Sequence, residues 1–95
     1  MKVAALFASG QVVATPGAIQ DFDPELIAQL LRRHLAGDWG ELDAHDIQAN
    51  NQALRTGARL LSAYETPVGR CWILTEATDD AGVRRSTCVL RPQDY

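Results

Sequence analysis

The amino-acid sequence predicts an α+β fold in which an antiparallel sheet of four to five strands carries two helices packed on one face. Three features support this prediction. Two amphipathic segments with good capping residues precede the last third of the chain and indicate helices. That last third contains short apolar segments separated by glycine-containing turns, which is the pattern of a strand meander. At 95 residues, with 46% apolar and 22% charged residues, the chain has the size and composition of a single domain.

The predicted meander is the element onto which the rest of the chain is expected to pack. Its three strands are Arg59 to Glu65, Arg70 to Ala77 and Val83 to Leu90. The turns between them, Thr66 to Gly69 and Thr78 to Gly82, each end in a glycine that can adopt a positive φ. The middle strand is apolar on both faces, so we expect it at the centre of the sheet.

The two predicted helices are defined by capping residues and apolar spacing. The first runs from Pro24 to Ala36, with Asp23 as N-cap and leucines recurring at helical spacing. The second runs from about Ala44 to Arg55 and has a narrower apolar stripe, so we expect it to be more exposed. Trp39 lies between the helices, and its large ring is expected to fill the gap between helix and sheet.

The N-terminal segment is predicted to contain at least one strand and no targeting signal. Gln11 to Ala14 is a β-branched run that predicts a strand, and Lys2 to Ala8 is either a further strand or a loose arm. Thr15 to Gly17 is expected to be a turn; its single glycine, without a lysine, disfavours a phosphate loop. Ala18 to Phe22 is a connector or a single helical turn. Without a secretory leader or a membrane-spanning run, we expect a soluble cytoplasmic protein with no membrane partner.

Polar residues cluster around the link between the two predicted helices. They are His34, Asp38, Glu41, Asp43, His45 and Asp46. A metal site would need several of them to converge, and their spacing matches no familiar ligand pattern. Loop and capping chemistry accounts for the aspartates, so we expect no metal, no cofactor and no acid–base catalysis here.

Cys71 and Cys88 fall on neighbouring predicted strands. Without a secretory leader they are expected to be reduced and buried, with a cross-strand disulfide as the alternative. A catalytic thiolate needs an exposed, electropositive position, whereas Cys71 lies beside Trp72 in the central strand. A cysteine–histidine dyad is therefore disfavoured, and we predict that the protein has no catalytic residues and is not an enzyme.

Several arginines lie on the predicted meander. Arg70 and Arg84 are expected to approach one another across the second hairpin and, with Arg59 and Arg85, to form a basic surface. Such a surface suits an acidic protein or a phosphate backbone, although edge charges also serve simply to prevent sheet-to-sheet pairing. The formal net charge of −3 argues against a nucleic-acid partner.

Two aromatic residues of the meander join these arginines as candidate protein-binding residues. Tyr64 and Trp72 are expected to share one face of the paired strands, and aromatic residues are enriched in binding hot spots. If the helices cover the other face, this one is free to bind. In the alternative, Tyr64 and Trp72 face the helices, and Cys71 and Ile73 point outward.

The chain resembles a group of small proteins carried by bacterial plasmids and integrative elements. The matching segments are VATPGA from Val13, RHLAGDWG from Arg33, NQALRTGARLLSAY from Asn51, WILTEA from Trp72, and the last strand. The segment from Asp79 to Arg84 departs from the pattern, and the first ten residues lie outside it. The resemblance implies a mobile-element setting and no particular activity. Some of these proteins carry a restriction-methylase label, but this chain has no cofactor-binding glycine motif to support it.

Together these observations predict a small non-enzymatic factor of a mobile genetic element that binds a host protein. A host defence system, CRISPR or restriction, is the expected target. The alternative is a nucleic-acid-associated accessory protein that uses the arginines of the C-terminal strands.

Overall fold

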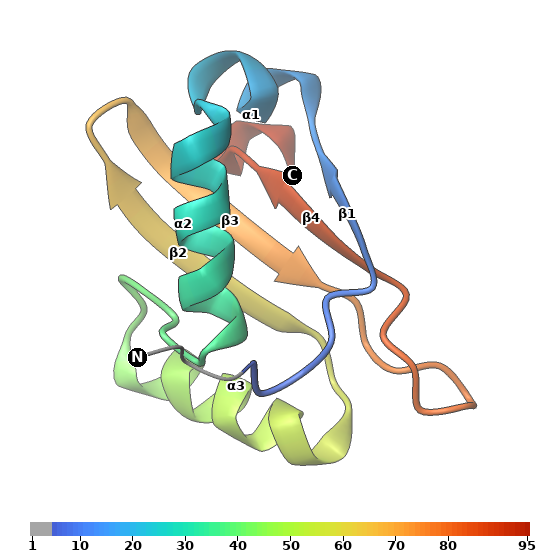
Figure 1. The fold of residues 1–95 in the computed structure, drawn as a ribbon. Coiled ribbons are helices and arrows are strands. Elements are labelled where there is room, and N and C mark those ends of the chain that lie inside the picture. The colour runs from blue at the N-terminus through green and yellow to red at the C-terminus, as the bar shows by residue number, and fades with distance from the viewer. Residues whose placement is uncertain (1–4) are drawn as a thin grey trace.

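The fold is known from a computed structural model that describes residues 5–95, over which helices and a four-stranded sheet combine in an α+β arrangement (Figure 1). Residues 1–4, and with them the start of the arm predicted from Lys2, lie outside the described residues. The elements, in chain order, are β1 (Gln11–Ala14), α1 (Pro16–Asp21), α2 (Pro24–Leu35), α3 (Ala44–Thr56), β2 (Leu60–Thr66), β3 (Gly69–Thr75), β4 (Ser86–Leu90) and the 3₁₀ turn η1 (Pro92–Asp94).

The sheet is mixed, with the strand order β1-β4-β3-β2. The predicted meander is confirmed, because β2 pairs antiparallel with β3 and β3 with β4. The prediction of a purely antiparallel sheet is wrong, since β1 pairs in parallel with β4, from Gln11 opposite Ser86 to Ala14 opposite Val89. Only a hairpin forces neighbouring strands to be antiparallel, and the helices and the other two strands separate β1 from β4 along the chain.

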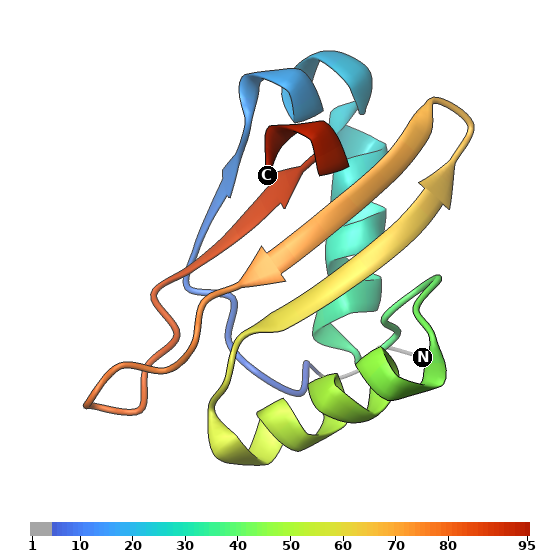
Figure 2. The same ribbon diagram turned by 180° about the vertical axis from the view of Figure 1, so that it is seen from behind.

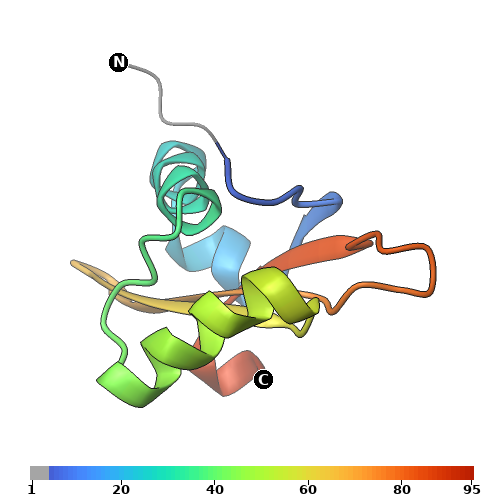
Figure 3. The same cartoon turned by 90° about the horizontal axis from the view of Figure 1, so that it is seen from below.

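The prediction that two helices pack on one face of the sheet holds only in part, because the structure has three α-helices and only α2 crosses a face in the predicted way (Figures 1 and 3). The long helix α2 crosses one face of the sheet, and α3 lies across the sheet end where β2 begins (Figures 1 and 3). The additional helix α1 follows β1 directly, where the sequence predicted a turn and then at most a single helical turn. Thr15 caps α1 by accepting a hydrogen bond from the Ala18 amide, and Pro16 suits its first turn.

The two predicted helices begin and end almost as expected because their caps are local. Asp23 accepts a hydrogen bond from the Leu26 amide at 2.8 Å, and Asp43 accepts one from the Asp46 amide at 2.8 Å. Helix α3 ends at Gly57, whose φ of 82° is the left-handed conformation that glycine adopts without strain.

The main core lies between α2 and the sheet. It joins apolar residues of α1, the α1–α2 link, α2 and the helix-facing side of the strands: Ala18, Phe22, Leu30, Tyr64, Cys71, Ile73 and Val89. Burying each large apolar side chain stabilises the fold by about 1.5–3 kcal/mol. Strand residues that point away from this core lie on the other face of the sheet.

A smaller core beneath the helix link centres on Trp39, which is buried as predicted. Its indole N–H donates to Asn51 Oδ1 at 3.0 Å, and its ring packs against Phe7 and His34. The same link protects the outer edge of β2, because Ala63 donates its N–H to the Trp39 carbonyl and accepts a hydrogen bond from the Glu41 amide.

Within residues 5–95, every helix is too short or too polar to cross a membrane.

Candidate protein-binding face

One face of the sheet has no helix layer along most of β2 and β3. Figure 2 shows this side, with β2 and β3 in front of α2, and Figure 3 shows α2 and η1 on opposite sides of the sheet. Strand alternation and register place Leu61, Trp72, Leu74 and Cys88 here, each half-buried. We call these four residues, with Tyr95, the open face.

Trp72 is the largest side chain of the open face. The Tyr95 ring packs against it edge-on, with 5.8 Å between ring centroids, and Tyr95 itself is 68% exposed. The Tyr95 hydroxyl accepts a hydrogen bond from Arg59 Nη1 at 3.1 Å. The Trp72 indole N–H is buried and donates to no acceptor among residues 5–95. A buried donor without an acceptor lowers the stability of a folded protein by about 1–3 kcal/mol, so such donors are uncommon.

Tyr64 does not share this face with Trp72, which corrects the expectation from the sequence. The register places Tyr64 opposite Cys71, and Ala63 opposite Trp72, so Tyr64 points towards α2. Its side chain is 1% exposed, and its hydroxyl donates to the Asp38 carbonyl at 2.6 Å. Burial raises the pKa of Tyr64 to about 12.

The alternative that placed Cys71 and Ile73 outward is also wrong. Both side chains are fully buried against the helix layer with Tyr64. Neither expected arrangement is therefore correct. Trp72 faces outward, whereas Tyr64 of the neighbouring strand faces α2 together with Cys71 and Ile73.

The predicted approach of Arg70 to Arg84 does not occur. Arg70 lies near the β2–β3 turn, where its Nε donates to Glu65 at 2.6 Å, while Arg84 forms a bridge with Thr78 at the far end of β3. Register and alternation put Arg70 on the same face as Trp72, so these two predicted residues do lie on one surface.

Arg84 is buried, with 7% of its surface exposed, and it acts as a clamp between three segments. Its Nη1 donates to the carbonyls of Ala58 and Glu76 at 2.7 and 2.9 Å, and its Nη2 donates to the Ala53 carbonyl at 3.0 Å. The neighbouring Arg85 is exposed and pairs with Asp79 at 2.5 Å. A continuous basic surface is therefore not formed by the predicted arginines.

His34, from the predicted polar cluster, is fully buried on α2 and contacts two hydroxyl groups of the sheet. Its Nδ1 lies 2.5 Å from Ser62 Oγ, and its Nε2 lies 2.8 Å from Thr75 Oγ1. Burial, together with the nearby Arg84 charge, lowers the pKa of His34 to about 4, so the ring is neutral at pH 7. A histidine–serine contact can activate a nucleophile, but Ser62 is also fully buried, and no substrate reaches it in this conformation.

The other members of the cluster do not converge with His34. Asp38 pairs with Arg33 at 2.6 Å, and this hydrogen bond lowers the pKa of Asp38. Asp43 caps α3, and His45 is exposed on the first turn of that helix. Over the part of the chain that the structure describes, no three His, Cys, Asp or Glu side chains are placed to hold a metal ion.

The two cysteines lie on opposite faces of the sheet, and both are free thiols. Cys71 is buried in the core as predicted, and burial raises the pKa of its thiol to about 11. Cys88 is half-buried on the open face opposite Leu74, and burial raises the pKa of its thiol as well. Neither cysteine is therefore a thiolate at pH 7, which is the form that nucleophilic catalysis needs.

Comparison with protein-family models, with curated proteins and with solved structures finds no match for this chain. The chemistry of its own residues is then the guide to function. The open-face residues that sequence reasoning did not single out are Leu61, Leu74 and Cys88; Leu74 lies opposite Leu61 on β2 and Cys88 on β4. The available signal was alternation: once Ile73 is assigned to the core, Trp72 and Leu74 must point the other way.

Proposed function

We propose that this protein is a small non-enzymatic binding factor that docks an apolar surface of a partner protein on its open face. The observation that carries the proposal is one-sided packing of the sheet. Helix α2 covers the face that contains Ile73, whereas the face that contains Trp72 and Leu74 has no helix along most of β2 and β3 (Figures 1 and 2). A sheet normally buries an apolar face against another layer, and here a partner would supply that layer.

The composition of the open face supports protein binding. Leu74 lies between Leu61 of β2 and Cys88 of β4, and the aromatic pair of Trp72 and Tyr95 adjoins this aliphatic centre. Charged residues at the border include Arg70 and Glu65, which pair with one another across β2 and β3. An aromatic and aliphatic centre with a charged border is the usual anatomy of a protein interface. The unpaired N–H of Trp72 adds a donor that a rearranged, bound surface can satisfy.

The groups that would perform catalysis are enclosed, which supports a binding role. His34 and Ser62 are fully buried, and the thiol pKa values of Cys71 and Cys88 are raised. The nucleic-acid alternative has less support, because Arg84 is engaged with backbone carbonyls. A salt-dependent DNA contact needs free arginine side chains on the surface.

The resemblance to mobile-element proteins suggests where this binding takes place. We propose that the partner is a host protein in the cytoplasm, and that components of CRISPR or restriction systems are the first candidates. The matching segment from Trp72 to Ala77 includes two open-face residues, so the resemblance and the proposed surface concern the same strand.

Affinity capture with matched variants tests this proposal. Tagged wild-type protein is expected to retain a specific host protein, and the purified partner is then titrated against each variant. Leu74→Glu places a charge at the centre of the open face and should abolish binding, whereas Gln29→Glu on the exposed side of α2 should not. Equal binding by both variants, or a normal defence response in cells that express the protein, would count against it.

A further inference from the structure

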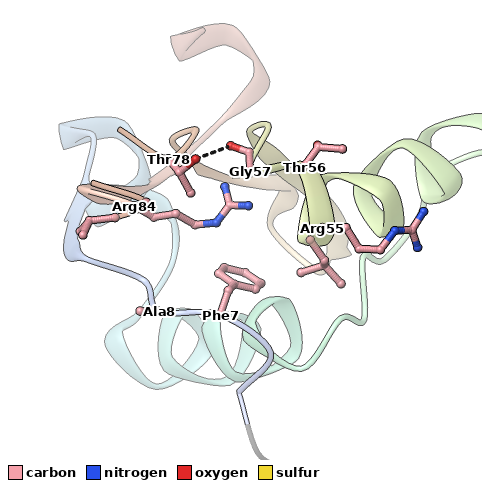
Figure 4. A pocket seen from close by; sticks show the side chains of 10 residues that line it. Phe7, Ala8, Arg55, Thr56, Gly57, Thr78 and Arg84 are labelled. Atoms are coloured by element: carbon pink, nitrogen blue, oxygen red, sulfur yellow. Dashed lines mark hydrogen bonds between the residues drawn. The ribbon is translucent and has the colours of Figure 1, made fainter. Parts of the chain in front are cut away.

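A second surface feature, formed by none of the open-face residues, is a pocket of about 510 Å³ (Figure 4). It lies between the N-terminal segment, the C-terminal end of α3 and the connection between β3 and β4. The lining residues that bear on its chemistry are Phe7, Gly57, Thr78, Gly82, Val83 and Arg84. The proposed function gives this pocket no role.

The pocket lining carries positive charge without a compensating acid. Arg84 directs its guanidinium group into the pocket, whereas that of Arg55 points away from Phe7 and Arg84 (Figure 4), and no Asp or Glu belongs to the lining. Arg84 forms no ion pair with any residue between 5 and 95; its partners are neutral carbonyls. Burying an unpaired charge is costly, so a bound anion would be favourable here.

Arg84 retains hydrogen-bonding capacity beyond its clamp. Two donors on Nη1 and one on Nη2 reach carbonyls, which leaves Nε–H and the second Nη2–H without an acceptor among the described residues. Figure 4 shows the guanidinium group between Phe7 and Thr78 inside the pocket. A guanidinium group is well suited to the oxygens of a carboxylate or phosphate. The charge of Arg84 is also felt by His34, whose pKa it helps to lower.

The rest of the pocket is suited to an apolar group. The Phe7 ring lies with its centroid 5.7 Å from the Arg84 Cζ and is held by stacking on Trp39. Val83, which is 46% exposed, adds an aliphatic wall at the surface. A volume of about 510 Å³ exceeds what a bare phosphate or carboxylate occupies and falls within the usual range for small-molecule sites.

We propose that this pocket binds a small organic anion, a carboxylate or phosphate attached to a flat apolar group. The oxyanion accepts hydrogen bonds from Arg84, and the apolar group lies against Phe7 and Val83.

Titration of the ¹⁵N-labelled protein with phenyl phosphate, benzoate and benzyl alcohol tests the proposal at constant ionic strength. We expect saturable amide shifts at Gly57, Thr78 and Gly82 with phenyl phosphate or benzoate, and whichever binds more tightly identifies the preferred oxyanion. Benzyl alcohol carries the same ring without the charge and should bind at least about tenfold more weakly. Equal binding of benzyl alcohol, or no saturable shift with either anion, would overturn the proposal.

A substitution outside the core localises the binding. Val83→Asp adds a negative charge at the pocket and should weaken anion binding by about tenfold or more through like-charge repulsion. Val68→Asp is the matched control, because Val68 is exposed at the β2–β3 turn and does not line the pocket. Both variants should give well-dispersed amide spectra. Unchanged anion binding by a folded Val83→Asp variant would contradict the assignment to this pocket.

Discussion

His34 Nε2 lies 2.8 Å from Thr75 Oγ1, in the middle of a buried hydrogen-bond chain that links α2 to the sheet and to the N-terminal segment. Thr75 Oγ1 lies 2.8 Å from Thr87 Oγ1, and the Thr87 hydroxyl donates to the Ser9 carbonyl at 2.8 Å. Because that carbonyl can only accept, the chain has one direction. Thr75 donates to Thr87, His34 donates from Nε2–H, and Nδ1 accepts from the Ser62 hydroxyl.

Removing the imidazole should therefore destabilise the fold strongly. His34→Ala leaves the buried Ser62 hydroxyl without its acceptor, removes the donor to Thr75 Oγ1 and opens a cavity beneath α2. We expect a loss of about 3–5 kcal/mol in the free energy of unfolding, measured by urea denaturation. His45→Ala, at an exposed position, should change it by no more than about 0.5 kcal/mol. A similar small effect at both positions would mean that the chain of hydrogen bonds is not formed.

The same histidine predicts a pH dependence of stability. Its pKa is about 4 in the folded protein and near 6.5 when unfolded, so the unfolded state binds the additional proton between these values. Stability is then complete above about pH 6.5 and is lost as the pH falls towards 4, by about 3 kcal/mol in total. Urea denaturation from pH 7.5 to pH 4 measures this slope. The slope should become shallower in His34→Gln, and an unchanged slope would assign it to other groups.

Gly40 is expected to be intolerant of substitution because of what lies beside it. Its φ is 77°, and an added Cβ would collide with the Ala63 carbonyl in the bridge that protects the β2 edge. Gly82 has the same φ of 77°, with open space around it. Gly82→Ala should cost about 1 kcal/mol from backbone strain, and Gly40→Ala at least about 2 kcal/mol more. Thermal unfolding of both variants measures the difference; equal losses would mean that the edge contact is unimportant.

Arg84 is a buried clamp, whereas the neighbouring Arg85 forms only a surface ion pair. Lysine substitutions at the two positions should therefore differ in their effect on stability. Arg84→Lys keeps the charge but cannot reach the three carbonyls of Ala53, Ala58 and Glu76 together, so we expect a loss of about 1–3 kcal/mol. Arg85→Lys should change stability by less than about 1 kcal/mol, because its partner Asp79 lies at the surface of an exposed loop. Chemical denaturation compares the two, and similar losses would contradict the clamp.

Local signals explain why the sequence predicted the helices and the meander well. Asp23, Asp43 and Gly57 define helix ends through contacts within a few residues, and a short turn joins β2 to β3, whereas residues 76–85 form a longer connection between β3 and β4. The parallel pairing of β1 with β4 depends on segments far apart in the chain, such as Gln11 and Ser86, and no local pattern encodes it.

The candidate site was predicted only in part, for a related reason. Leu60 and Leu61 are both apolar, and β3 is apolar on both faces, so alternation alone does not say which face the helices cover. Once that face is assigned, the open face follows from strand geometry. His34 was predicted to belong to the polar cluster of the helix link, although its position four residues after the buried Leu30 places it on the core side of α2.

Photo-crosslinking from defined positions tests whether a partner protein binds the open face. A benzophenone amino acid replaces Leu74 on the open face in one protein and Gln29 on the exposed side of α2 in another. After irradiation in host cells, we predict a specific covalent product with one host protein from position 74 and none from position 29. A product from position 29 alone, or only a crosslinked dimer of this chain from position 74, would contradict the account.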